Sequence, residues 1–234
     1  MRNPGPGGTV LGWGDFDVST SLQWSKRRFR PLELQQIKRI GRRLEKIPEL
    51  TPDPAHWSAL SPARKQAALR QAVDDVMTIF RIPPSRRPRV EFYNGPPGDY
   101  GSASWRFDPL AGGRLKPQTR RGVLSININS SVGDAVVTVV HEGRHYYQSW
   151  EAYQQSIGRR AHPFATTWRE NLPGSGGDYE YSYQTAKTPA GLVYVLDSFG
   201  HKIPNPKYFT QPIERDAESF GRRVADRLPL RWRT

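Results

Sequence analysis

The segment His-Glu-Gly-Arg-His at residues 141–145 carries the residue types of a metal-dependent hydrolytic centre. On a helix, residues four apart lie on one face, so His141 and His145 can bind the same zinc ion. Glu142 lies about 100° further round the helix, where it can act on a water molecule without being a ligand. Two neutral nitrogen ligands, a carboxylate base and an open metal position are the minimum set for metal-assisted hydrolysis. We therefore expect a zinc hydrolase, and a peptidase in particular.

A catalytic zinc ion needs a third protein ligand. The longer motif with a third histidine is excluded, because Gln148 and Glu151 occupy its glycine and histidine positions. The chain has no cysteine, so the remaining ligand types are His, Asp and Glu. We favour Glu214, and Glu218 four residues later could hold a ligating imidazole in place or be the ligand itself. The alternative ligands elsewhere in the chain are Asp178, His162, Asp197 and His201.

The segments around the motif have clear periodicities. Residues 122–129 alternate between apolar and polar and predict a half-buried strand, whose edge could accept an extended peptide. Ser130, Ser131 and Asp134 then predict the start of a helix that runs from about 132 to 155. Pro212 suits the start of a later helix. Its apolar stripe, suited to packing against the motif helix, is Ile213, Ala217, Phe220 and Val224.

The N-terminal third is predicted to be helical and basic. Residues 32–47 have apolar positions at helical spacing, and a second helix should start at Ser61 and Pro62 and stop before Pro83. Residues 1–30 are rich in glycine, proline and charge and predict an irregular basic arm. Residues 31–88 then form a helical portion, and the strand patterns begin at residue 89.

The stretch Thr138–Gln148 resembles the active-site helix of zincin metallopeptidases. Together with residues 212–217, it is similar to the gluzincin-type peptidase domains of bacterial polymorphic toxins and secreted effectors. The resemblance implies an α+β fold over residues 89–234, with a small mixed sheet packed on the motif helix. It also implies that His141, His145 and Glu214 bind zinc and that Glu142 is the general base. Arg144 is charged where zincins carry an uncharged residue, so we expect it to reach solvent or a partner.

A peptidase also needs a donor for the oxyanion that develops on the scissile carbonyl. Tyr183, His201 and Tyr208 are the candidates. For a toxin-like peptidase, the resemblance implies a protein substrate, an acidic immunity or inhibitor protein, and export by a specialised secretion system or action in a target-cell cytoplasm.

The net charge of +13 over 234 residues favours anionic partners such as nucleic acid, membrane headgroups or an acidic protein, although a solvated basic surface explains it equally well. No apolar run approaches the roughly 18 residues of a membrane span, and the N-terminus has no apolar segment typical of a signal peptide. Two other functions are consistent with the sequence. One is an inactive zincin-like fold that binds a partner, and the other is a nucleic-acid-binding protein in which the motif is incidental.

Overall fold

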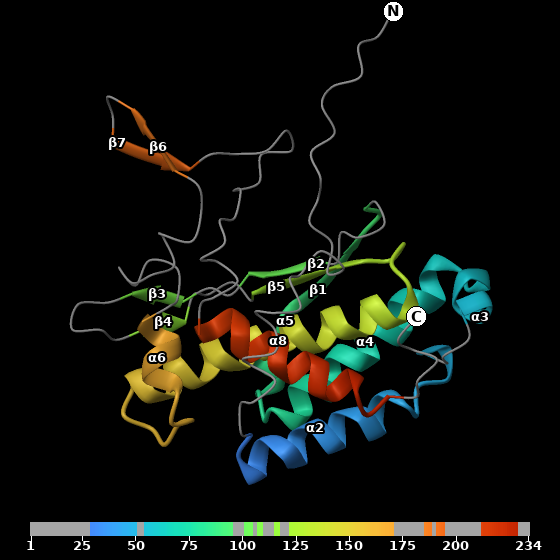
Figure 1. The fold of residues 1–234 in the computed structure, drawn as a ribbon, viewed down its shortest axis with the longest axis horizontal. Coiled ribbons are helices and arrows are strands. Elements are labelled where there is room, and N and C mark those ends of the chain that lie inside the picture. Colours follow the sequence, from blue (N-terminus) through green and yellow to red (C-terminus); the bar gives the residue numbers. More distant parts are fainter. Residues whose placement is uncertain are drawn as a thin grey trace, which may run out of the picture.

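The structure is a computed structural model, and it describes residues 29–50, 54–95, 122–170 and 212–228 together with five short strands outside these ranges. It combines a layer of helices with a small mixed sheet, which confirms the predicted α+β class (Figure 1). The described helices are α2 (Pro31–Leu44), α3 (Pro54–Ala59), α4 (Pro62–Ile79), α5 (Val132–Ser156), α6 (Ala165–Glu170) and α8 (Pro212–Ala225). Short 3-10 turns lie at Pro48–Leu50 and Pro84–Arg86.

The main sheet has three strands in the order β1 (Arg89–Tyr93), β5 (Val123–Asn127) and β2 (Gly101–Ser104). Strand β1 is parallel to β5, and β2 is antiparallel to it. Because β5 has a partner on each side, the expectation that this strand offers an edge to a peptide is wrong. Two separate hairpins are formed by β3 (Phe107–Pro109) with β4 (Leu115–Pro117), and by β6 (Thr185–Thr188) with β7 (Gly191–Tyr194).

The helix starts follow the capping chemistry that the sequence predicts. The Ser61 hydroxyl accepts a hydrogen bond from the Arg64 amide at 3.4 Å at the start of α4. The Ser131 hydroxyl accepts one from the Asp134 amide at 3.1 Å at the start of α5. Helix α2 ends at Leu44, three residues before the predicted end. Pro48 follows, and a proline disfavours helical backbone in the residue before it.

Buried side chains of α2, α4, β5, α5 and α8 form one hydrophobic cluster. Figure 1 shows α5 and α8 running side by side beneath the sheet, with α4 and α2 completing the helical layer. The helices of residues 31–88 therefore pack on the same core as the motif helix. The predicted division at residue 88 stays a prediction, and the predicted arm lies almost entirely outside the described residues.

A glycine in the motif controls how closely α4 approaches α5. A Cβ atom added to Gly143 would lie 2.8 Å from the Cγ1 atom of Val76, which is closer than side-chain atoms pack. Val76 is fully buried and its branched side chain has few alternative rotamers, so it cannot move away easily. The glycine of the His-Glu-Gly-Arg-His segment is thus required by packing on α4.

Candidate metal centre

Three predicted ligands from two helices converge at one point. His141 and His145 of α5 and Glu214 of α8 each offer one ligand atom, and these atoms lie within 4.8 Å of one another. The two Nε2 atoms are 2.9 Å apart, and Glu214 Oε2 lies 3.2 Å from His145 Nε2 and 3.6 Å from His141 Nε2. Ligands about 2.0–2.1 Å from a tetrahedral zinc ion are about 3.3–3.4 Å from one another. The group could therefore hold a metal ion.

Helix α8 brings Glu214 to the histidines because its apolar face packs on α5. The predicted stripe of Ile213, Ala217, Phe220 and Val224 is buried. Gly221 lies on the side of α8 that faces α5, since a Cβ atom there would be 3.8 Å from the Cβ atom of His141. Once this face is buried, Glu214, next to Ile213 in the chain, lies at the border of the helix pair and reaches the imidazoles.

Glu142 borders the ligand group without joining it. Its Oε1 atom is 4.0 Å from His141 Nε2, and 14% of its side chain is exposed. A carboxylate beside the ligands and in contact with solvent has the surroundings that a proton acceptor needs. The assignment of Glu142 as general base stays a prediction.

Glu218 lies on the other side of the His141 ring. Its Oε2 atom is 3.8 Å from His141 Nδ1, while Glu214 approaches Nε2 of the same ring. Glu218 also pairs with Arg222 of the next helical turn. The spacing of four residues between the two acids therefore places one at each nitrogen of His141, the arrangement considered in the sequence interpretation.

The Glu214 carboxylate and the His145 imidazole strongly influence each other's protonation. Burial by itself lowers the pKa of His145, but the Glu214 carboxylate beside it outweighs this effect and raises the pKa to about 9. Burial raises the pKa of Glu214, but the charges and hydrogen bonds of His145 and His141 hold it well below its usual range. The site therefore favours a positive charge, carried by a proton or a metal ion, between these groups.

Arg144 is fully buried, so the expectation that it reaches solvent or a partner is wrong. Its Nε and Nη2 atoms donate to the two carboxylate oxygens of Asp216 at 2.8 and 3.2 Å, and Nη2 also donates to Glu33 Oε1 at 2.6 Å. The guanidinium carbon lies 4.4–6.0 Å from the ring centroids of Phe220, Tyr147, Trp168 and Phe80. Two acids and four aromatic rings replace the water that this cation would otherwise need.

Gln148 and Asp216 are site residues that sequence reasoning missed. Gln148 excluded the longer histidine motif and ended the stretch that resembles zincins, but no role of its own was predicted for it; its Oε1 atom lies 2.9 Å from His145 Nδ1. The available signal was their spacing, because Gln148 is one helical turn after His145 and Asp216 is two residues after Glu214. His162, an alternative ligand, instead stacks on Trp168 with ring centroids 4.5 Å apart. The predictions for Asp178, Tyr183, Asp197, His201 and Tyr208 lie outside the described residues.

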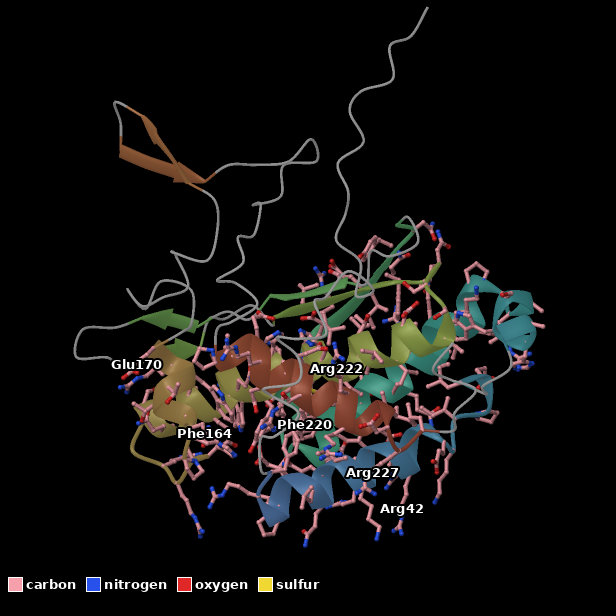
Figure 2. All side chains as sticks on the ribbon, in the orientation of Figure 1. Arg42, Phe164, Glu170, Phe220, Arg222 and Arg227 are labelled. Carbon is pink, nitrogen blue, oxygen red and sulfur yellow. The ribbon has the colours of Figure 1, made fainter. Side chains whose placement is uncertain are left out.

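The basic surface predicted from the net charge includes the outer face of α2. Figure 2 shows Arg42 and Arg227 at the rim of the molecule, where Gly41 packs against Arg227. The exposed cations of α2, the turn that follows it and the end of α8 are Lys38, Arg39, Arg42, Arg43, Lys46, Arg222, Arg223 and Arg227. Within the described part of the chain, none of the helices has the length and apolar character needed to cross a membrane. Nucleic acid and acidic proteins stay predicted partners.

No protein-family model matches the chain, and comparisons with curated proteins and with solved structures gave no match either. The resemblance to zincins therefore rests on the motif and on the segment around Glu214. Function therefore has to be inferred from the geometry and chemistry of the site itself.

Proposed function

We propose that this protein is a zinc-dependent metallopeptidase of the zincin-like, gluzincin type. The observation that carries the proposal is the convergence of His141, His145 and Glu214, whose ligand atoms lie within 4.8 Å of one another. The two histidines share one helix, but Glu214 comes from α8 and is 69 residues from His145. A chance motif on α5 would not require a half-buried acid from a second helix to meet its imidazole nitrogens.

The chemistry of the ligands favours zinc over other common divalent ions. Two histidine nitrogens and one carboxylate are a usual ligand set of catalytic zinc. Magnesium and calcium prefer all-oxygen surroundings, which two imidazoles do not supply. His141 and His145 are buried, so an ion held there is shielded from bulk water on the protein side.

When bound, zinc would supply Lewis acidity, which lowers the pKa of a water molecule and polarises the carbonyl of a substrate. The protein then has to move one proton. Glu142 is the assigned acceptor, because its carboxylate borders the ligand group and remains partly exposed. Its carboxylate takes a proton from the attacking water and delivers it to the leaving amine nitrogen, which completes hydrolysis of a peptide bond.

An edge strand that contacts the motif helix supports binding of a protein substrate. Among the described strands, β2 is an edge of the three-stranded sheet, and it contacts α5 as well as pairing with β5. An extended peptide can pair with such an edge through backbone hydrogen bonds and so lie along the motif helix. The resemblance of the sequence to toxin and effector domains implies that the substrate belongs to a target cell.

The test combines zinc content with the activity of one site variant and one control variant. Wild-type protein should purify with, or take up, one zinc ion and cleave an unstructured protein substrate, and chelation should abolish cleavage. Glu142→Gln should keep zinc and lose hydrolysis, whereas Glu170→Gln, which changes an exposed acid on α6, should keep both (Figure 2). Cleavage by Glu142→Gln at the wild-type rate refutes the assigned base.

Three further outcomes test the third ligand, the rival function and the metal centre itself. Glu214→Ala should lose zinc affinity, and unchanged binding would move the third ligand elsewhere. A zinc-loaded wild-type protein that cleaves no peptide in a diverse library would instead indicate an inactive, partner-binding fold. A protein that takes up no zinc at all refutes the proposal.

A further inference from the structure

The orientation of the Gln148 side chain is determined by the groups around its amide nitrogen. Nε2 lies 2.9 Å from the Ile213 carbonyl oxygen and 2.7 Å from Asp216 Oδ2. A carbonyl and an ionised carboxylate can only accept hydrogen bonds, so the NH2 group must face them. Oε1 must then face His145 Nδ1, which is 2.9 Å away.

This orientation decides the roles of the two nitrogens of His145. Because Gln148 Oε1 can only accept, Nδ1 must carry a hydrogen and donate it. The other nitrogen, Nε2, then faces His141 Nε2 at 2.9 Å and Glu214 Oε2 at 3.2 Å. A metal-bound histidine generally donates its second ring N–H to a fixed acceptor, which holds the ring in position.

Asp216 is itself held from the other side. Arg144 donates to both of its carboxylate oxygens, and Glu33 of α2 accepts a further hydrogen bond from Arg144 at 2.6 Å. Glu33, Arg144, Asp216 and Gln148 are all buried. A continuous series of hydrogen bonds thus runs from α2 through α5 and α8 to the ring of His145.

We propose that Gln148 and Asp216 are positioning residues that hold His145 with Nε2 toward the ligand group, and that they thereby set the affinity for the metal ion. The inference rests on the proposed zinc site. Because Arg144 and Glu33 extend the series of hydrogen bonds to α2, this helix also supports the metal centre. The carboxamide is needed because it accepts from His145 and donates to Asp216 at the same time, which neither an apolar nor an ionised acidic side chain of this length can do.

The first test measures zinc affinity by competition with a chromophoric chelator. Gln148→Met keeps the length of the side chain but removes both hydrogen-bonding groups, and it should raise the zinc dissociation constant by about 10–100-fold. Gln154→Met is the matched control, since Gln154 lies on the same helix, is buried, and has an Nε2 atom without a hydrogen-bond partner in the structure. Its zinc affinity should stay within about twofold of wild type, because it does not contact the site.

The second test starts with the wild-type protein, whose spectrum alone can overturn the inference. In zinc-loaded protein with isotope-labelled histidine, the imidazole spectrum should show His145 with a hydrogen on Nδ1 that exchanges slowly with solvent. In Gln148→Met, that hydrogen should exchange faster. A His145 ring bound to zinc through Nδ1 overturns the inference even if Gln148→Met does not fold.

The failures of the two proposals can be told apart. Wild-type protein that binds no zinc refutes the metal centre and this inference with it. Wild-type protein that binds zinc, together with a Gln148→Met variant that binds it equally tightly, overturns the positioning role alone.

Discussion

The buried cation Arg144 offers the sharpest test of how this fold is held together. It is fully buried, it joins Asp216 of α8 to Glu33 of α2, and four aromatic rings surround it. Replacing it with methionine retains an unbranched side chain that can pack among the rings. The substitution also leaves two buried carboxylates without their counter-charge.

The expected cost follows from those two carboxylates. Removing one partner of a buried ion pair destabilises a protein by about 3–5 kcal/mol, because the remaining charge is buried without compensation. The total stability of a domain is about 5–15 kcal/mol, so Arg144→Met should fold but be severely destabilised. The triple variant Glu33→Gln, Arg144→Met, Asp216→Asn removes the charges as well and should recover part of the loss.

The assay is urea unfolding of metal-free protein, followed by circular dichroism, so that zinc binding does not add to stability. With an m value of about 2–3 kcal/mol per molar urea, Arg144→Met should lower the unfolding midpoint by about 1–2 M. Arg64→Met is the control. Arg64 pairs with Glu49 at 3.0 Å, but its side chain is 61% exposed. Loss of such a surface pair should cost about 0–1 kcal/mol.

Two results would refute this reasoning. A midpoint for Arg144→Met that matches the Arg64→Met control would show that the buried pair contributes no more than a surface pair. A triple variant that is less stable than Arg144→Met would show that lost packing and hydrogen bonds, and not uncompensated charge, dominate the cost.

Three further predictions follow from the site and its surroundings. Because the pKa of His145 is raised to about 9, its contribution to the free energy of unfolding of metal-free protein should be complete below about pH 6.5 and be lost as the pH rises through 9. Saturating zinc should suppress this loss. Urea unfolding at pH 6, 7.5 and 9 checks this prediction, and a metal-free stability that does not change with pH contradicts it. Gly143→Ala should be less stable than Gly221→Ala by about 1–3 kcal/mol. The added methyl group lies 2.8 Å from Val76 in the first variant and an ordinary 3.8 Å from His141 in the second. Equal thermal midpoints of the two variants would contradict this prediction. If the outer face of α2 binds nucleic acid, the affinity for a labelled oligonucleotide should fall steeply as the salt concentration rises. At a fixed salt concentration, Arg42→Glu should bind more weakly than wild type, while Glu142→Gln should bind equally well. Binding that does not depend on salt would exclude phosphate contacts.

Much of the helical framework could be predicted because its determinants are local. The Ser61 and Ser131 caps, the start of α8 at Pro212 and the apolar stripe of that helix follow from neighbouring residues and a helical period. The strand at 123–127 also followed from its alternation. Its place in the sheet did not, because strand order depends on which distant segments pair with it. The prediction of a free edge failed for that reason.

The order of residues in the chain is enough to place His141 and His145 one turn apart on a helix with an acid between them, because that geometry depends only on the helical repeat. The sequence also limited the third ligand to an oxygen or nitrogen donor, since the chain has no cysteine. Tertiary structure alone decided that Glu214 meets the imidazoles and that Gln148 and Asp216 hold His145. It also decided that Arg144 points into the core, since its partners Asp216 and Glu33 lie 72 and 111 residues away in the chain. A buried charge is stable only where folding brings opposite charges to it, and no local pattern records which distant helix will supply them.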